Sequence, residues 1–506
     1  MTITKTKKIA ANNTVTWSVS ADGYEPQTGT IENINDDKIL NINLLGKYGT
    51  IDVPVKKVSS SGHTTIILLK DGSVWGCGRN NKYQINSKGG QFSTFQKICD
   101  DGIDILSIGY GTFVIKKDNT LWAIGNSDYS FPLFGTSSLY SFTKIFDNIK
   151  KVSCSGNNTL LLTTEGEVYG CGCNTYGDLG VGDTTRHDSF VKVNITDVKD
   201  IYTFEHTSWI LKNDNSLWSC GFNPRGNQGT GDTTQRTVFG KRLENVADVK
   251  AIGSFTLALK LDGSLWGCGE NSYGCLGDFS TTEYTTTFTK ISDNVKKIFV
   301  GGYRSGFITN DASSDLYLTG WGTSGEQCNG QYNHVYGFHK VASNVEDAIL
   351  SESTWILNKD GEIWMSGSDN YGSSGKNKHS TLIKKFSNAK TIKGGSFCCW
   401  AINEEGGLYG CGNNEYYAQA TTSPSIVTEF TKRNMTKTGY NSAIFSITPT
   451  PSDAEVTIDN NQVSTAEIRK GTSANWTVSK SGYKTKSGTT DLLYNDLDLN
   501  VELEVE

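Results

Sequence analysis

Residues 260–274, with the sequence KLDGSLWGCGENSYG, decide the fold of this 506-residue chain. An apolar run ends at Leu261 and meets Asp-Gly, a pair that tolerates the positive φ of a tight hairpin turn. A second strand follows from Ser264 to Cys268, and Gly269 ends it. The stretch therefore predicts a β-hairpin with Trp266 at the centre of its second strand.

The same hairpin returns along most of the chain. The spacing between successive copies of the marker aromatic is 45 to 51 residues, a period typical of solenoids, arrays and propellers. No long amphipathic stretch predicts a helix inside the period. Four short strands fit it, and in the third unit we expect them at 152–155, 159–163, 168–171 and 190–193. The markers are Trp75, Trp122, Tyr169, Trp218, Trp266, Tyr317, Trp364 and Tyr409.

This repeat predicts an all-β fold: a β-propeller of eight units, with seven blades as the alternative, and small β-sandwich modules at both termini. Radial closure would protect the strand edges that an open array exposes. We expect a truncated module at 1–46, the propeller at 47–445 and a complete module at 446–506. Segments 49–53 and 438–445 resemble further strands of the repeat, so strands from both ends are expected to close the ring.

The loops after the marker strands carry a second recurring pattern. The third unit reads NTYGDLGVGDTT at 174–185, and the fourth reads GNQGTGDTT at 226–234. Over roughly residues 50–435 the pattern resembles the repeat of the regulator of chromosome condensation family, which implies a β-propeller. The units here are shorter than is usual in that family, and the first, second and last lack the Gly-Asp turn. No motif carries over the family's nucleotide-exchange activity.

Composition argues against several classes of protein. The net charge is −6 and the pI is about 5.7, and no basic stripe exists, so nucleic acid is not an expected partner. The N-terminal residues 1–8 are polar, and no apolar run approaches the roughly 18 residues of a membrane span. We therefore expect a soluble protein without a signal peptide or membrane insertion.

Five of the twelve cysteines share one slot, two residues after the marker aromatic. Other units place Ile, Thr or Ser in that slot, so it reads as a small packing position on a strand. We predict buried free thiols there rather than disulfides or metal ligands. The five are Cys77, Cys171, Cys220, Cys268 and Cys411.

The two ends of the chain contain copies of one β segment. Trp17 matches Trp476, and Gly23-Tyr24 matches Gly482-Tyr483. Three N-terminal strands are expected, at 14–20, 28–34 and 38–44.

The C-terminal copy has an additional front half at 446–459, and it resembles a PEGA-type or bacterial immunoglobulin-like module. Without that half, the N-terminal copy would leave an open sheet edge. We therefore hypothesise that the termini make assembly contacts, with a frayed tail as the alternative.

One position varies from unit to unit, at the turn between the first two strands: it lies twelve residues before the marker, or fourteen in the sixth unit, where two residues are inserted. Propeller turns of this kind lie on one face around the central channel, and a mixture of aromatic and polar residues suits recognition. An exposed turn without a ligand is the alternative. The Ser or Thr two residues later is expected to tie down the turn. The candidate ring comprises His63, Tyr110, Asn157, His206, Ser254, Tyr303 with its neighbour Arg304, Glu352, Phe397 and, in a partial ninth unit, Tyr440.

Two loops are rich in aromatic residues. Tyr129 and Phe131 lie in the second unit, and Tyr332 and Tyr336 lie in the sixth. Because loops on a rigid scaffold often carry binding residues, we include these four in the candidate binding site. Filling of gaps between blades is the alternative.

The sequence contains no recognisable catalytic pattern. Six histidines show no metal spacing, and neither a nucleophile motif, a phosphate loop nor paired carboxylates appear. Gly-Asp-Thr at 182–184 and 231–233 predicts turns stabilised by Asp rather than calcium sites. Enzymatic activity, a cofactor and a metal are therefore not expected, and a glycan hydrolase is the least favoured hypothesis.

These observations favour a non-enzymatic structural or adhesion protein of a bacteriophage, assembled in the host cytoplasm and located in the virion. Its terminal modules would bind other virion proteins, and its propeller face would bind a host-surface glycan or protein or a neighbouring virion component. A homo-oligomer is compatible with this hypothesis. The alternative is a cytoplasmic, protein-binding scaffold or regulator of the same repeat family.

Overall fold

The computed structural model describes the following residues: 15–19, 27–31, 48–61, 63–126, 133–155, 157–280, 282–368, 378–394, 398–421, 425–433, 436–440, 442–450, 452–459, 462, 464–469, 473–490 and 497–504. The chain forms two compact units, Pro54–Arg433 and Met1–Val53 with Asn434–Glu506. In the described residues no helix is long and apolar enough to span a bilayer.

Residues 55–433 fold into eight four-stranded antiparallel sheets, each built from four consecutive strands. The first four sheets are β4(Val55–Ser61), β5(Thr64–Leu69), β6(Val74–Arg79) and β7(Gln91–Cys99); β8(Gly102–Ile108), β9(Gly111–Lys116), β10(Leu121–Gly125) and β11(Leu139–Phe146); β12(Ile149–Ser155), β13(Asn158–Thr163), β14(Val168–Gly172) and β15(His187–Lys192); and β16(Val198–Phe204), β17(Thr207–Lys212), β18(Leu217–Gly221) and β19(Arg236–Leu243).

The remaining four sheets follow the same plan. They are β20(Val246–Ile252), β21(Phe255–Lys260), β22(Leu265–Glu270) and β23(Tyr284–Ser292); β24(Val295–Gly301), β25(Arg304–Thr309), β26(Leu316–Gly320) and β27(Val335–Ala342); β28(Val345–Leu350), β29(Ser353–Asn358), β30(Ile363–Gly367) and β31(His379–Phe386); and β32(Thr391–Gly394), β33(Cys398–Ile402), β34(Leu408–Gly412) and β35(Val427–Arg433).

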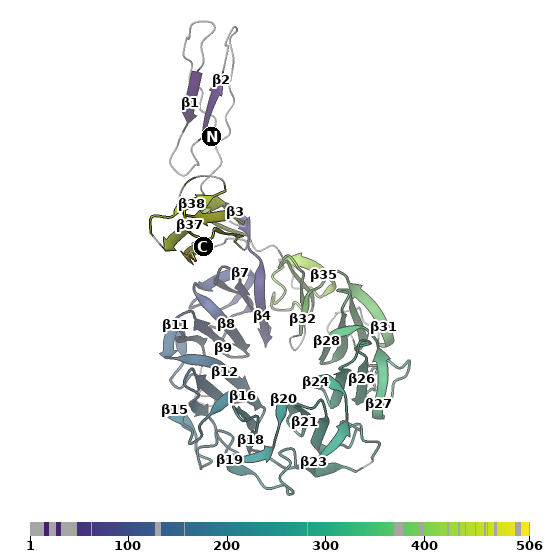
Figure 1. Cartoon of the computed structure of the whole chain (residues 1–506). Coiled ribbons are helices and arrows are strands. Elements are labelled where there is room, and N and C mark those ends of the chain that lie inside the picture. The colour runs from purple at the N-terminus through teal and green to yellow at the C-terminus, as the bar shows by residue number, and fades with distance from the viewer. Residues whose placement is uncertain are drawn as a thin grey trace. The chain divides into compact units, whose positions relative to one another are not determined.

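The sheets stand around a central opening, with the first strand of each sheet on the inside and the fourth on the outside (Figure 1). Neighbouring sheets share cores; for example, Leu257 and Leu265 of the fifth sheet pack with Ile298 and Phe307 of the sixth. The predicted all-β propeller is confirmed, and each sheet contains one marker aromatic as the repeat indicated.

A hydrogen-bonded chain explains why the Asp-Gly turn and the marker aromatic recur together. In the fifth sheet, Asp262 Oδ1 accepts from the Ser264 N–H at 2.9 Å and from Ser264 Oγ at 2.6 Å. Ser264 Oγ in turn accepts from Trp266 Nε1 at 2.9 Å. The same chain joins Asp71, Ser73 and Trp75 in the first sheet. The turn and the marker ring are therefore fixed by residues within one hairpin.

The hydroxyl slot after the first turn does not tie down that turn, and this part of the prediction is wrong. Thr256 Oγ1 is buried and donates to the Asn227 carbonyl of the preceding sheet at 2.8 Å. Thr354 Oγ1 donates in the same way to Glu326 at 2.7 Å. Because the partner lies about one half-repeat earlier in the chain, the slot joins neighbouring sheets instead.

The cysteine slot makes a parallel connection. Cys268 is buried, and its Sγ lies 3.4 Å from the same Asn227 carbonyl. Thr319 occupies this slot in the sixth sheet and donates to the Gly274 carbonyl at 2.9 Å. All five slot cysteines are buried free thiols, as predicted. Cys, Thr and Ser alternate there because each is a small donor that reaches the neighbouring sheet.

Replacing Thr256 by valine is expected to lower the free energy of unfolding by about 1 kcal/mol, because the substitution keeps the shape but removes the hydroxyl donor to the buried Asn227 carbonyl and leaves it only the weak thiol donor of Cys268. Urea unfolding of the full chain would measure the change. Thr287→Val, at an exposed position of β23, is the control and should have almost no effect. Equal losses in both variants would contradict the inter-sheet role of the hydroxyl.

Closure of the ring differs from the prediction. Strand β3(Tyr48–Asp52) pairs with β36(Thr436–Tyr440), so the two ends do meet, but they pair only with each other. No four-stranded sheet in the described residues combines strands from both ends. The first and eighth sheets instead meet through contacts between complete sheets, including Val55 N–H to the Gly406 carbonyl at 2.8 Å.

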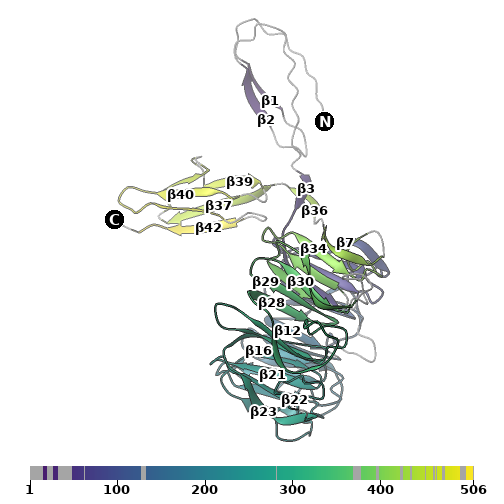
Figure 2. The ribbon, with the colours of Figure 1, turned by 90° about the vertical axis from the view of Figure 1, so that its right-hand side faces the viewer.

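The C-terminal segment forms two three-stranded sheets, whose strands lie side by side in Figure 2. Ile447, Ile458, Val478 and Val501 from the two sheets share one core. This segment begins before residue 446, the predicted boundary. The sheets are β39(Thr465–Arg469), β37(Ser442–Thr450) and β42(Leu497–Glu502), with β37 and β42 parallel, and β38(Glu455–Ile458), β40(Asn475–Ser479) and β41(Lys486–Thr489).

The N-terminal copy has the register of its C-terminal counterpart. Trp17 in β1(Val15–Val19) lies opposite Gly29 in β2(Gln27–Ile31), as Trp476 lies opposite Gly488 in β40 and β41. The internal duplication seen in the sequence is thus repeated in strand pairing. The third expected strand, 38–44, lies outside the described residues, and the resemblance to PEGA-type or immunoglobulin-like modules stays a prediction.

Candidate recognition face

We call the varying turn residue the turn slot. A backbone hydrogen bond joins its carbonyl to the chain just after the marker aromatic, at the end of the third strand of the same sheet. In the fifth sheet the carbonyl of Ser254 accepts the Glu270 N–H at 2.9 Å, and in the sixth the carbonyl of Tyr303 accepts the Trp321 N–H at 3.0 Å. The residue four after the marker, here called the exit slot, therefore lies beside the turn slot. The two side chains extend from one fixed backbone pair.

A glycine makes this close pairing feasible. Gly269 precedes the exit slot with φ +102°, and a Cβ there would lie 2.4 Å from the Ser254 carbonyl oxygen. Gly320 has the same φ, and its Cβ would lie 2.4 Å from the Tyr303 oxygen. Only glycine fits both the backbone conformation and the close approach.

A third varying position lies seven residues after the marker, in the loop that follows the exit slot; we call it the loop slot. A buried Asn shapes this loop, since Asn271 Oδ1 accepts the Leu276 N–H at 2.9 Å and Asn174 Oδ1 accepts the Leu179 N–H at 3.0 Å. In the fifth sheet the loop slot is Tyr273, which lies between Asn271 and Leu276. This bond fixes the loop so that Tyr273 is directed toward the following sheet.

The loop slot of one sheet, together with the turn and exit slots of the next, forms a set at each sheet boundary. Ring or charge contacts join five of the six described sets across the boundary. In the order loop, turn and exit slot, the described sets are Lys82, Tyr110 and Asn126; Tyr176, His206 and Phe222; Arg225, Ser254 and Glu270; Tyr273, Tyr303 and Trp321; Ser324, Glu352 and Ser368; and Tyr416, His63 and Arg79.

Two sets are built from rings packed against one another at an angle. Tyr176 lies with its centroid 4.8 Å from His206 and 4.3 Å from Phe222. Tyr273 lies 5.4 Å from Tyr303 and 4.8 Å from Trp321, edge to face in both cases. Such packing fixes amphipathic rings without covering them completely, so they can still contact a ligand.

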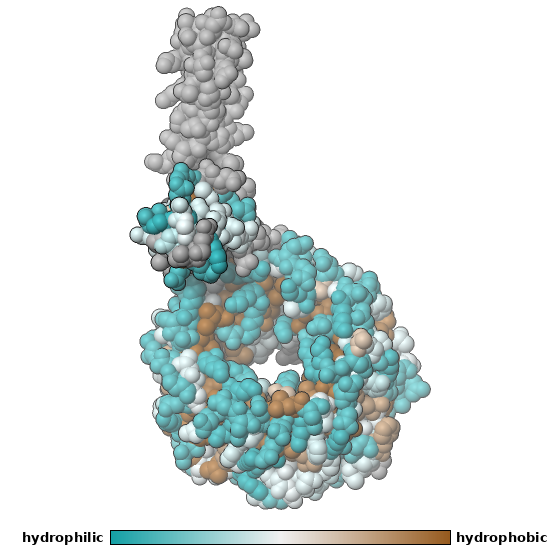
Figure 3. Space-filling view, in the orientation of Figure 1, coloured by the Kyte–Doolittle hydropathy of each residue, from teal (hydrophilic) through white to brown (hydrophobic). Residues whose placement is uncertain are grey.

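Other sets carry charge. Arg225 Nε lies 3.1 Å from Glu270 Oε2, and the Lys82 ammonium lies 5.8 Å from the Tyr110 ring centroid. At the boundary that closes the ring, His63 lies 4.8 Å from Tyr416. Burial lowers the pKa of His63, an effect that Glu415 opposes and Arg79 increases. The face therefore presents chemically different side chains in a fixed circular order. Figure 3 shows apolar patches among a mainly hydrophilic surface near the central opening.

The structure places the predicted ring residues in three ways. His63, Tyr110, Asn157, His206, Ser254, Tyr303 and Glu352 occupy equivalent turns and are at least partly exposed. Phe397 lies outside the described residues, as do Tyr129 and Phe131 of the second unit. Tyr440 is in β36, part of the other compact unit, so it does not extend the ring.

Arg304, predicted beside the ring, is unsuitable for ligand contact. Its side chain is 2% exposed, and its guanidinium donates to Thr354 Oγ1 at 2.7 Å and to the Ser351 carbonyl. It therefore joins the sixth and seventh sheets. In the sixth-unit loop, Tyr332 and Tyr336 are exposed.

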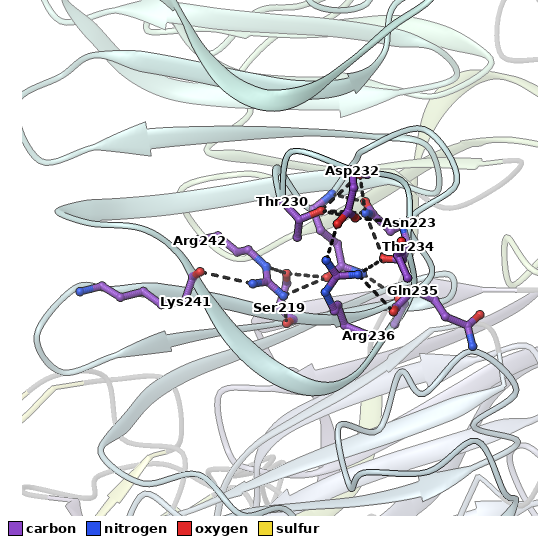
Figure 4. A network of polar contacts seen from close by, with 11 residues as sticks. Ser219, Asn223, Thr230, Asp232, Thr234, Gln235, Arg236, Lys241 and Arg242 are labelled. Atoms are coloured by element: carbon purple, nitrogen blue, oxygen red, sulfur yellow. Dashed lines mark hydrogen bonds and ion pairs between the residues drawn. The ribbon is translucent and has the colours of Figure 1, made fainter.

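The Gly-Asp turns are closed by their own side chains. Figure 4 shows Asp232 between Thr230 and Arg236, with Arg236 Nη2 2.7 Å from Asp232 Oδ2 and the Thr234 N–H 2.9 Å from Asp232 Oδ1. The hydrogen bonds from Arg236 and Thr234 lower the pKa of Asp232 to about 2. These contacts fit the predicted structural role of Asp, and the described residues contain no group of three or more His, Cys, Asp or Glu arranged to hold a metal.

Sequence reasoning found the turn slot but missed the exit and loop slots. A signal for the loop slot was present: five of its eight residues are tyrosine, at 129, 176, 273, 371 and 416. The partner of each tyrosine belongs to the next repeat, so an alignment of single units does not join them.

Beneath this face lies a buried carboxyl group. Asp178 is 1% exposed at the boundary between the third and fourth sheets, and Asn158 Nδ2 donates to its Oδ2. Burial raises the pKa of Asp178 to about 6, against the opposing effect of nearby backbone N–H groups. The equivalent slot in the fourth sheet holds Asn227, also buried.

Known protein families match both the propeller and the C-terminal segment. The Regulator of chromosome condensation (RCC1) repeat matches residues 55–84, 149–178 and 246–275, and a second description of that repeat matches 165–198. The Head fiber dimeric protein-like domain matches residues 442–506. No curated protein is similar enough to this chain to count as a match.

Among solved structures, the first match below supports the propeller fold. A chain in the crystal structure of Kap60 bound to yeast RCC1 (Prp20) has 16% identity and a TM-score of 0.50, over 62% of this chain and 83% of that one. Prp20p from Saccharomyces cerevisiae has 17% identity and a TM-score of 0.49, over 58% and 80%. Human WBSCR16 has 15% identity and a TM-score of 0.40, over 83% and 94%. The repeat matches and the first of these structures show a β-propeller with RCC1-like repeats, followed by a segment similar to the Head fiber dimeric protein-like domain.

Proposed function

We propose that this chain is a non-enzymatic structural and binding protein of a bacteriophage particle. The match of residues 442–506 to the Head fiber dimeric protein-like domain carries the proposal. In this function the C-terminal segment attaches the chain to other virion proteins. The propeller presents its circle of slot residues to a host-surface component or to a neighbouring virion protein.

Two features of the chain support this division of roles. Residues 54–433 form a compact unit with their own cores, so the propeller can present a rigid face. The slots of that face differ from boundary to boundary, whereas the residues that position them are repeated. A repeated scaffold with varied surface residues is suited to recognition rather than to a single catalytic centre.

Particles from the source organism test the proposal. Mass spectrometry and cryo-electron microscopy are expected to find the chain at a repeated site. A variant that lacks residues 442–506 should keep the propeller fold but be absent from particles, because the attachment segment is lost. If the wild-type chain is absent from particles and copurifies with a soluble partner, the intracellular scaffold replaces this proposal.

A further inference from the structure

Exposed aromatic side chains gather on the fifth and sixth sheets. Ten large apolar side chains are exposed in the described part of the chain, and five of them lie between residues 279 and 336. Tyr303 is 47% exposed, at the turn slot of the sixth sheet, and Tyr332 and Tyr336 are exposed in and beside the loop between β26 and β27. A concentration of this kind marks an interaction site rather than scattered surface residues.

These exposed rings adjoin the set Tyr273, Tyr303 and Trp321. His334 lies 5.2 Å from Tyr273 and 4.6 Å from Trp321, measured between ring centroids. Tyr336 lies against the loop of Tyr273, since a Cβ on Gly274 would be 2.6 Å from its Cα. Tyr273, Tyr303, Trp321, His334 and Tyr336 therefore form one group, which we call the aromatic platform, whereas the Tyr332 hydroxyl donates to the Lys378 carbonyl beside the seventh sheet.

We propose that the aromatic platform binds an uncharged saccharide. This inference rests on the proposed function and names the ligand class of its recognition face. A pyranose ring has a face of C–H groups and a rim of hydroxyls. The C–H face is matched by the electron-rich face of an exposed aromatic ring, and the hydroxyls are matched by polar groups at the platform's edge.

The polar groups of the platform suit a polyhydroxylated sugar better than the apolar surface of a protein partner. Its tyrosines carry hydroxyls, and Tyr303 and Tyr336 are exposed, so polar groups lie at the edge of the rings. The next boundary on one side carries Arg225 and Glu270, and the next on the other side carries Ser324 and Glu352. The platform is thus a narrow aromatic strip between polar sets, whereas a stable protein interface needs about 800 Å² from each partner.

The neighbouring charges favour a neutral ligand. The guanidinium of Arg225 is already engaged by two carboxylates, with Nε 3.1 Å from Glu270 Oε2 and Nη1 2.5 Å from Glu283 Oε1. An anionic sugar would have to compete with both carboxylates for this cation. An uncharged hexose or hexosamine leaves the pair intact.

The test is a titration of the full chain with chitotriose, maltotriose and mannotriose, followed by saturation-transfer NMR, with sialyllactose as the anionic comparison. At least one neutral trisaccharide is expected to bind. Tyr303→Asn should weaken that binding about tenfold, because the stacking ring is lost. Asn tolerates the positive φ of this turn, 58°, and Asn157 occupies the same slot in the third sheet.

Tyr140→Asn is the matched control, since Tyr140 is 54% exposed on the second sheet, and it should bind like the wild type. Three results would overturn the inference: no binding of any neutral trisaccharide at a concentration of about 20 mM; binding of sialyllactose alone; or unchanged binding by Tyr303→Asn. Particle location is measured separately, so a chain found on virions that ignores sugars leaves the proposed function standing.

Discussion

Replacing Gly269 by alanine is expected to lower the free energy of unfolding by about 3 kcal/mol, since both backbone strain and a steric clash contribute. The φ of +102° is unfavourable for any L side chain, and the new Cβ would lie 2.4 Å from the Ser254 carbonyl oxygen and 2.7 Å from the Phe255 Cα. Relief of the clash requires separation of β21 from β22. That movement would break the bond between the Glu270 N–H and the Ser254 carbonyl.

Gly231→Ala is the control that separates the two contributions. Gly231 has a φ of +86°, but no atom lies within 4 Å of the position of its Cβ. Its substitution should therefore cost only the conformational term, about 1 kcal/mol. Urea unfolding midpoints of the two full-length variants measure the difference. Equal shifts would mean that the close approach at Gly269 has no energetic consequence.

Replacing Asp178 by asparagine is expected to stabilise the propeller at neutral pH by up to about 3 kcal/mol, the free energy that corresponds to a rise of the pKa from its usual value to about 6. A carboxyl group with a raised pKa is more protonated in the folded state than in the unfolded state. Stability of the wild type therefore falls as the pH rises from about 4 to about 6, and then levels off. The amide does not titrate, so the advantage of Asp178→Asn should be absent below about pH 4 and complete above about pH 6.

The architecture already accepts an amide at this position, because Asn227 fills the equivalent slot one sheet later. Asp214→Asn supplies a control of opposite sign. The Ser216 side chain and N–H donate to Asp214 Oδ1 and lower its pKa, so its replacement should destabilise the protein near neutral pH and not in acid. Thermal unfolding across pH would show both trends. A pH-independent effect of Asp178→Asn would contradict the ionised state assigned to this carboxyl.

Much of the fold and part of the site are readable from the sequence, because they depend on contacts within one hairpin. The Asp-Gly turn, the Ser that follows it and the marker aromatic interact over a span of five residues, as in Asp262, Ser264 and Trp266. The same chain of bonds recurs in the first, second, fourth and fifth units, so these local contacts predict the strands, the propeller and the turn slot. The buried cysteine slot follows from the same alignment.

Contacts between units could not be predicted in this way. Thr256 bonds to the preceding sheet, and Arg304 is buried against the following one, although sequence reasoning assigned the first to its own turn and the second to a ligand. The loop slot joins its partner only when two sheets pack at the angle that the ring imposes. Residues within a repeat are placed by the turn and strand geometry of their own chain segment. Residues at a boundary are placed by the packing of neighbouring sheets, which only the tertiary structure determines.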